Sequence, residues 1–397
     1  MLDENGSNPV AAELLVAARK LRPVLAERAE KTDRDRRLPD DTITELTNAG
    51  LFRVTGHKRR GGHGLTALES IEITAELAKG CTSTAFVQAL LDGSRGVVVA
   101  MLDDEGVDEV FSTSDDPLIT GILAPGGTAV PVDGGFLVNG RWSYATGCWH
   151  AGWTMGGVLV ADADGNVVDG GTIYAPMSEL TIEDTWHVAG MRGTGSATVV
   201  ASDVFVPKRR ISLQSEMGAK FENMDFSKAE PVDLRPFAEV FALVLLGPVL
   251  GAAEAALELV AGGVDKRGIS YFTFEKQSDS HVVLEQIGEA AMRIDTAWLH
   301  TRRAAKVVED ATMTGPLDAK TGARCRADAG YAMAQVRQAV DTLMNVAGTS
   351  AFAESNPLQR IWRDVNVASR HGYLASKPNL ELYGRAYCGV EPSISMF

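Results

Sequence analysis

The sequence predicts an α+β protein of several domains, in which a β-rich region lies between two helical regions. Apolar residues recur at helical spacing up to about residue 111, and helical periodicity returns after residue 235. Between Asp116 and Val206, β-branched runs alternate with turn dipeptides instead. We therefore expect an N-terminal helical domain over 1–114, a central β-barrel or sandwich domain over 115–210 and a C-terminal four-helix bundle over 211–397.

The N-terminal region contains helices whose ends are marked in the sequence. Thr42 and Glu45 have the spacing of a capping box, and Gly50 is placed to end that short helix. Apolar residues from Ala67 to Ala78 then follow one helical face, and a further apolar helix is expected over about 83–102.

The β-rich region carries four turn dipeptides between its runs of β-branched residues. Asp-Gly and Asn-Gly pairs are typical of tight hairpins because both central residues tolerate positive φ. Residues 207–235 are charged and aperiodic, so we expect a long surface connection there. The four pairs are Asp133-Gly134, Asn139-Gly140, Asp164-Gly165 and Asp169-Gly170.

The C-terminal region predicts a bundle because its helical segments are long and strongly periodic. Its most apolar stretch, Phe241–Val264, contains a proline and two glutamates, so we expect a buried bundle helix and not a membrane span. Surplus apolar faces in this stretch favour cover by another subunit, and we expect a homotetramer. The predicted helices are about 236–265, 280–312, 318–347 and 357–372.

Charge and cysteine spacing exclude several classes of protein. A net charge of −14 over 397 residues repels phosphate backbones, so nucleic acid is not expected as a partner. The four cysteines form no CxxC pair and the seven histidines are scattered, so neither a metal site nor a disulfide framework is expected. The N-terminus lacks the basic and apolar regions of a secretory signal, and we expect a cytoplasmic protein with no membrane partner.

Generic catalytic signatures are absent. The sequence contains no G-x-S-x-G, Walker A or H-E-x-x-H motif. Gly193-Thr194-Gly195 looks like the start of a dinucleotide fingerprint, but residue 198 is threonine and the flanking segments are strand-like. That fingerprint needs a helix N-terminus after its glycines, so no nicotinamide-binding loop is expected.

Three segments, in the expected regions and order, carry a specific resemblance. Residues 140–148 are GRWSYATGC, residues 186–196 are WHVAGMRGTGS with VFVP at 204–207, and residues 356–364 are NPLQRIWRD with His371 seven residues later. Together they resemble the acyl-CoA dehydrogenase superfamily. Within it they resemble the two-component flavin monooxygenases, such as aromatic and indole hydroxylases and the p-hydroxyphenylacetate hydroxylase oxygenase components.

This resemblance implies an acyl-CoA dehydrogenase-like fold and a reduced-flavin-dependent monooxygenase. It would hydroxylate a bulky aromatic or indole-type substrate through a flavin C4a-hydroperoxide, using reduced FAD or FMN from a separate flavin reductase and molecular oxygen as co-substrate. Two enzymatic alternatives share the scaffold, an acyl-CoA dehydrogenase and an amine N-oxygenase. A non-enzymatic helical interaction protein would have no use for the flavin-like segments.

The same resemblance assigns roles to individual residues. It places Thr146 beside flavin N5, where a hydroxyl would hold the oxygenated flavin, and it directs His371 at flavin and substrate. Trp142 and Tyr144 alternate in direction from Ser143 on a strand, which suits a flat wall along the ring. The expected cofactor-binding residues are Trp142, Ser143, Thr146, Gly147, Met191, Arg192, Gly193, Thr194, Ser196 and, across a subunit boundary, Arg267; the expected catalytic residues are His371 and Thr146.

The substrate pocket is expected to contain Phe86, Ser94, His150 and His371. Many relatives have a second histidine in the helix after the Ser83-Thr84-Ala85 run, but here that position falls near Asp92 or Ser94. His150 either substitutes for it or is a packed core residue. His371, expected on a helical face with Asp364 and Ala368, either takes a substrate proton or stabilises the distal peroxide oxygen. The first role predicts a rate that rises with pH in the imidazole range.

Overall fold

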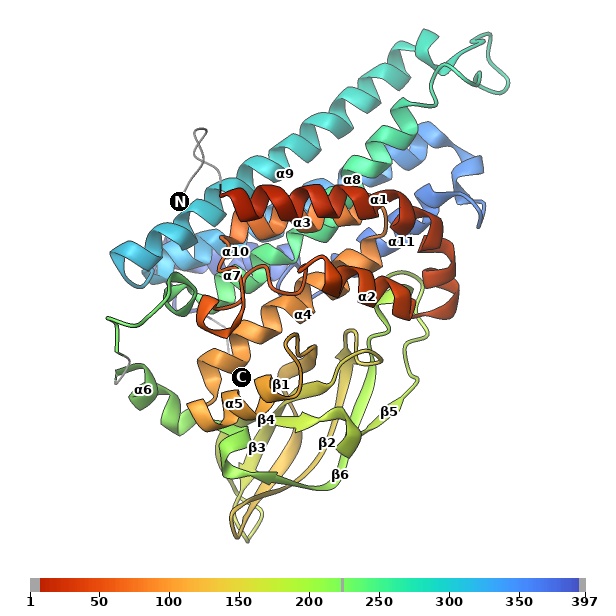
Figure 1. The fold of residues 1–397 in the computed structure, drawn as a ribbon. Helices are drawn as coiled ribbons and strands as arrows, with labels where there is room; N and C mark the ends of the chain where they lie inside the picture. Colours follow the sequence, from red (N-terminus) through yellow and green to blue (C-terminus); the bar gives the residue numbers. More distant parts are fainter. Residues whose placement is uncertain (1–7, 223–224, 393–397) are drawn as a thin grey trace.

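The computed structural model describes residues 8–222 and 225–392, and its helices and strands follow the predicted order of helical, β-rich and helical regions (Figure 1). The N-terminal helices pack over one side of the sheet, and the long C-terminal helices lie beyond them (Figure 1). The first region consists of α1 (Pro9–Asp35), α2 (Asp40–Asn48), α3 (Ala67–Ala78), α4 (Thr82–Met101) and α5 (Asp104–Ser112), with a 3₁₀ turn at Lys58–Arg60.

The capping box in this region is on α3 and not on α2. Thr66 and Glu69 satisfy each other's backbone N–H groups at the start of α3. The box predicted from Thr42 and Glu45 is wrong, because α2 begins two residues earlier and the guanidinium of Arg28 binds both side chains. Spacing alone could not show that an arginine on α1 would take these two oxygens.

The central strands form one seven-stranded sheet in the order β5-β6-β2-β1-β3-β4-β7, with β1 and β3 parallel and the other pairs antiparallel. Residues of β4 and β6 also contact each other, so the sheet curls around an apolar interior. The strands are β1 (Ile119–Val132), β2 (Gly135–Ala145), β3 (Trp153–Ala161), β4 (Val167–Pro176), β5 (Thr181–Glu183), β6 (Ala197–Pro207) and β7 (Ile211–Leu213).

Two of the four predicted turns are turns. Asp133-Gly134 joins β1 to β2, and Asp164-Gly165 lies between β3 and β4. The other two predictions are wrong, because Asn139-Gly140 and Asp169-Gly170 lie inside β2 and β4. Their polar side chains bind neighbouring segments instead: Asn139 accepts from the backbone of Asp203 at a bulge, and Asp169 accepts from Ser215.

The expectation that residues 207–235 form an irregular surface connection is also wrong. It contains β7, α6 (Gln214–Glu222) and a 3₁₀ turn at Pro231–Leu234. Asp233 and Glu230 bind Arg59, and Asp233 also lies 2.7 Å from His57 Nε2. These ion pairs fix the segment against the N-terminal region, where its end becomes part of a cavity wall.

The C-terminal region is helical from Phe237 onward, and its helices share one large core with α3. The stretch Phe237–Ala261 is long and apolar enough by composition to cross a membrane, which corrects the expectation that it is too polar. Because 78% of its most apolar window is buried inside the protein, it has the character of a core helix. The helices are α7 (Phe237–Val244), α8 (Leu246–Ala261), α9 (His281–Thr314), α10 (Ala319–Ala347), α11 (Pro357–Ala368) and the unpredicted α12 (Ser376–Cys388).

Helices α3 and α8 approach so closely that only glycine fits between them. A Cβ added at Gly251 would lie 1.9 Å from the carbonyl oxygen of Ala75, and one at Gly247 would lie 2.9 Å from that of Ile71. The two glycines therefore set the distance between the N-terminal helices and the bundle.

Candidate active site

A cavity of about 1420 Å³ lies where the three regions meet. Its walls come from α4, the ends of β1 and β2, the loop at 186–196, the segment 233–241, the start of α10 and residues 367–373. The predicted site residues Phe86, Ser94, Thr146, Met191, Thr194, Ser196 and His371 all line it. Segments more than two hundred residues apart in the sequence thus converge on one hollow.

Three buried hydroxyls form a hydrogen-bond chain along the sheet side of the cavity. Thr194 Oγ1 donates to the carbonyl of Met191 at 2.9 Å, so its single proton is used there. Ser196 must then donate to Thr194 at 2.7 Å, and Thr146 must donate to Ser196 at 2.8 Å. The chain leaves Thr146 Oγ1 with its proton committed and a lone pair open: toward the cavity it is an acceptor.

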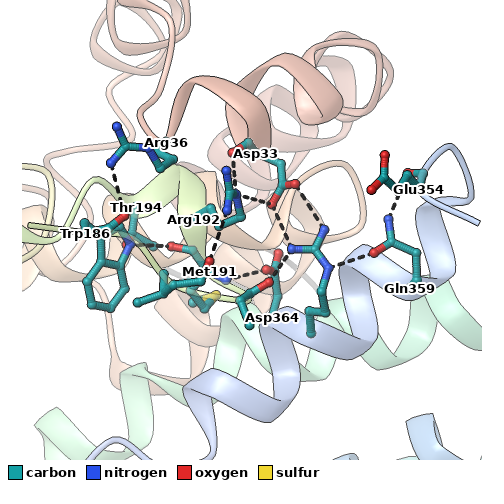
Figure 2. Close-up of polar contacts among 12 residues, drawn as sticks. Asp33, Arg36, Trp186, Met191, Arg192, Thr194, Glu354, Gln359 and Asp364 are labelled. Atoms are coloured by element: carbon teal, nitrogen blue, oxygen red, sulfur yellow. Dashed lines mark hydrogen bonds and ion pairs between the residues drawn. The ribbon is translucent and has the colours of Figure 1, made fainter. Parts of the chain in front are cut away.

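The loop that carries this chain is held in an uncommon backbone conformation. Met191 has φ 54° and is 2% exposed, a strained state for a residue with a side chain. Its N–H donates to Asp364 Oδ1 at 2.5 Å, and its carbonyl accepts from Trp186 Nε1 at 2.9 Å (Figure 2). Burial raises the pKa of Asp364 to about 7, against the opposing effect of the bond from Met191.

A second set of contacts fixes the same loop to α1 and α11. Arg363 binds the carboxylate of Asp33 at 3.0 Å and also donates to the carbonyl of Ala189. Arg192 donates to the carbonyls of Asp33 at 3.0 Å and Val188 at 3.2 Å (Figure 2). The arginine–aspartate pair of the C-terminal motif therefore positions the loop from two sides.

His371 also lines the cavity, and it lies after the end of α11, not on it. The predicted helical face shared with Asp364 and Ala368 is wrong there, because the helix ends at Ala368 and the chain turns. His371 Nδ1 accepts from the backbone N–H of Tyr373 at 3.3 Å, which assigns the ring proton to Nε2. Burial lowers the pKa of His371 to about 4, so the ring is neutral at ordinary pH.

Aromatic rings surround His371. Its ring centroid lies 6.3 Å from Phe86, 6.1 Å from Phe241 and 6.2 Å from Tyr373, and Phe241 and Tyr373 meet edge to face at 4.9 Å. This part of the cavity is an apolar slot for a flat ring.

Several predicted residues lie outside the cavity lining. Trp142 is 2% exposed within the curled sheet and donates to the carbonyl of Gly157 at 2.8 Å, so the flavin wall expected from it is not formed by its ring. Tyr144, two residues later, does face the cavity, with its ring 6.0 Å from that of Trp186. A register shift between Trp142 and Ala145, with φ 68° at Tyr144, breaks the alternation that would give both rings one direction.

Other predicted residues support the site from behind. Gly147, at φ 72°, donates its N–H to the carbonyl of Thr194 at 2.9 Å, and a Cβ at Gly193 would meet Thr32 at 2.3 Å. Ser143 lies beside Thr198, within 3.3 Å, and outside the lining.

His150 and Arg267 lie elsewhere. His150 Nδ1 is 3.4 Å from Asp40 at the start of α2 and outside the cavity lining, so the structure does not bring it together with the other residues predicted for the pocket. Arg267 is exposed beyond α8 and binds Ser350 at 3.0 Å and Gln277 at 3.1 Å.

Several other cavity residues carry no recognisable sequence signal. Trp186 belongs to the motif at 186–196, whereas Phe241, Glu239, Arg326 and Tyr373 belong to no motif. Each lies in a helix or turn, where periodicity predicts only which side chains face the protein interior. Only the fold brings them to the same wall.

Comparison with known proteins gives a consistent picture over the whole chain. The acyl-CoA dehydrogenase N-terminal domain matches residues 15–110, and the acyl-CoA dehydrogenase C-terminal domain matches 243–375. The flavin-dependent monooxygenase oxygenase subunit HsaA of Mycobacterium tuberculosis is 32% identical over 97% of this chain and 98% of its own. The oxygenase component of the FADH(2)-dependent resorcinol hydroxylase of a Rhizobium species is 30% identical over 92% and 91%.

A solved structure agrees with these relatives. XiaF from a Streptomyces species, in complex with FADH2 and glycerol, superposes with a TM-score of 0.94 at 35% identity and covers 98% of both chains. The resemblance and the fold class expected from the three sequence segments are confirmed.

Proposed function

This chain belongs to the acyl-CoA dehydrogenase family, among its flavin-dependent monooxygenase oxygenase subunits, and we propose that it hydroxylates an aromatic substrate with reduced flavin and molecular oxygen. The reduced flavin, FADH2 or FMNH2, would come from a separate reductase. Relatives named as oxygenase subunits and components support this division of labour, as does the lack of a nicotinamide-binding loop in the sequence. None of the relatives described above is named for acyl-CoA desaturation or amine N-oxygenation, so these two alternatives gain no support.

The residues at the cavity fit a flavin. The volume exceeds the roughly 300–1,000 Å³ of an ordinary small-molecule pocket, which leaves room for a tricyclic ring and a substrate together. Bound reduced flavin supplies the electrons that activate molecular oxygen. The residues that would hold it are Tyr144, Thr146, Trp186, Met191, Thr194 and Ser196, all at one side of the cavity.

The observation that carries the proposal is the direction of the hydroxyl chain. Thr146 Oγ1 presents an acceptor to the cavity, because its proton is donated to Ser196. Reduced flavin has an N–H at N5 where oxidised flavin has only a lone pair. An acceptor at Thr146 therefore favours the reduced form, which suits an enzyme that receives its flavin already reduced.

In the same cavity, His371 acts as a hydrogen-bond donor. Nδ1 is engaged by the backbone of Tyr373, so the neutral ring offers Nε2–H to the cavity and has no free basic nitrogen. Of the two roles left open by the sequence, taking a substrate proton and stabilising the distal peroxide oxygen, only the second is that of a donor, and this geometry supports donation. A donor beside a substrate oxygen stabilises its phenolate form, which raises the electron density of the ring.

Phe86, Phe241 and Tyr373 orient the aromatic ring against this donor and exclude water from it. Ser94, whose hydroxyl donates to the carbonyl of Leu90 at 2.8 Å, adds no free donor of its own. Around His371 the pocket is thus shaped mainly by aromatic rings, and the imidazole supplies the hydrogen-bond donor there.

The active form is proposed to be a homotetramer, although the reason differs from the one drawn from sequence. The Phe241–Val264 stretch is largely covered by its own chain and offers few apolar faces to a partner. Tyr271 and Phe272 are instead fully and 70% exposed on the loop that carries Arg267. Covering this loop with a second copy would bury both rings and bring Arg267 to that copy's flavin. Light scattering that finds a fully active monomer would refute this assembly.

The proposed function is tested by supplying different sources of electrons to the purified protein with a panel of phenols and indoles. Chemically reduced flavin and oxygen should give a product heavier by one oxygen atom. NADH with oxidised flavin should give none until a flavin reductase is added. Reduction of the protein's flavin by NADH alone would contradict the two-component proposal.

A further inference from the structure

Arg326 is a cation in the cavity wall that forms no ion pair with any residue the structure describes. It lies on α10, and its Nε is buried with no hydrogen-bond partner among residues 8–222 and 225–392. No carboxylate of the described chain lies within ion-pair distance of its guanidinium. Arg235, which lines the same cavity, is by contrast paired with Glu309 at 3.0 Å.

Arg326 is half-buried, and its buried Nε loses hydration that only a partner can replace. Glu239 is the nearby acid, but its carboxylate rests on α10 at Gly322, one helical turn before Arg326, and forms no ion pair with it. The face of the Tyr373 ring, 4.4 Å from the guanidinium carbon, supplies a cation–π contact. This contact leaves the N–H groups in the plane of the guanidinium without an acceptor. The forked N–H groups of Arg326 therefore remain available to a ligand.

The position of Arg326 relative to His371 defines what that ligand is. Both side chains line the cavity beside the ring of Tyr373, which is 4.4 Å from the guanidinium carbon of Arg326 and 6.2 Å from the imidazole of His371. A molecule that contacts both has to extend along Tyr373, and two fused rings offer that reach. Its oxygen near His371 and its acceptor near Arg326 must lie at opposite ends.

We propose that Arg326 binds a carboxylate of the substrate, so that the substrate class is a fused-ring aromatic acid with its acid group at the end away from His371. This inference rests on the proposed function for the placement of the reacting ring at His371. A planar guanidinium matches a carboxylate through two parallel hydrogen bonds, a geometry that a neutral amide or an unsubstituted ring cannot reproduce. Arg326 is then a specificity-determining residue, and Tyr373 holds its fork in place.

The test compares three probes with the flavin-loaded protein: a hydroxynaphthoate with hydroxyl and carboxylate at opposite ends, its primary carboxamide and the parent naphthol. Binding is measured by calorimetry without oxygen, so that no turnover is needed. The wild type should bind the acid about tenfold to a hundredfold more tightly than the carboxamide, the contribution of hydrogen bonds to a charged group. Arg326→Met should reduce this preference to less than about twofold while leaving naphthol affinity unchanged.

Arg326→Gln guards against a folding failure of the methionine variant, because it keeps a polar side chain of similar reach, and it must also lose the preference. Arg302→Met is the matched control, since Arg302 likewise lies over a ring, 4.9 Å from that of Trp298, but outside the cavity lining. Its preference for the acid should equal that of the wild type.

Two failures are distinguishable. If the wild type binds the acid selectively and Arg326→Gln loses this selectivity, the inference is supported even when no probe is oxygenated. In that case only the proposed function is contradicted. Equal affinity of the wild type for acid and carboxamide, or an unchanged preference in Arg326→Gln, overturns the inference even if naphthol is hydroxylated.

Discussion

Replacing Thr146 with valine should weaken the binding of reduced flavin and leave oxidised flavin almost unaffected. Valine keeps the shape of the side chain, which is 8% exposed, and removes only the hydroxyl that ends the chain through Ser196 and Thr194. The N5–H of reduced flavin would then face a methyl group. An unpaired buried donor costs about 1–3 kcal/mol, so the dissociation constant of reduced flavin should rise by about 5- to 150-fold.

Anaerobic titration of chemically reduced flavin, followed by fluorescence or calorimetry, measures this directly, and the same titration with oxidised flavin should change by less than about twofold. Thr154→Val is the control, because Thr154 is equally buried on β3 but does not line the cavity. Under turnover, Thr146→Val should also divert oxygen into hydrogen peroxide at the expense of product. An equal loss for both redox forms, or none for either, would refute the acceptor role of Thr146.

Four further predictions concern His371, the loop and the core. His371→Ala should slow hydroxylation by about 10²–10⁴-fold, whereas His371→Gln, which retains an N–H donor, should recover part of this; equal loss in both would favour a proton acceptor. Because the pKa of His371 is about 4 and the ring keeps its Nε2–H in either protonation state, the rate should show no inflection near 6.5; an inflection there that His371→Gln abolishes would contradict the donor role. Asp364 has its pKa raised to about 7 in the fold, so it stabilises the protein below about pH 4 and loses that contribution as pH rises through 7. Asp364→Asn should therefore gain stability relative to wild type between pH 4 and 8 in urea unfolding, and a constant difference would count against it. Gly251→Ala should lower the free energy of unfolding by about 1–3 kcal/mol or more, because its Cβ would meet a backbone carbonyl at 1.9 Å. Gly288→Ala, on the exposed face of α9, is the control and should raise the free energy of unfolding by about 0.4–1 kcal/mol. Similar melting temperatures for the two variants would argue against the tight α3–α8 contact.

The sequence was informative where local chemistry decides the outcome. Asp133-Gly134 forms the predicted turn between β1 and β2. The periodicity of α9 and α10 predicts the ends of both helices to within two residues. The motifs around Thr146 and Met191 line the cavity because the fold brings the end of β2 and the loop at 186–196 together.

It was less informative where a single distant contact decides. The bulge after Trp142 sends its ring inward and the ring of Tyr144 to the cavity, and nothing in the alternation of residues announces it. His371 changes from a possible base to a donor because one backbone N–H, that of Tyr373, occupies Nδ1. Arg326 is an ordinary polar residue of a periodic helix until the fold leaves it without a carboxylate.

The most direct test of the central claim is to follow the origin of the oxygen atom. The purified protein, chemically reduced flavin and isotopically labelled dioxygen are mixed with an aromatic substrate, and the product is analysed by mass spectrometry. The proposal predicts one labelled oxygen atom on the ring, and no product with oxidised flavin. An unlabelled product, or desaturation of a thioester by oxidised flavin, would contradict it.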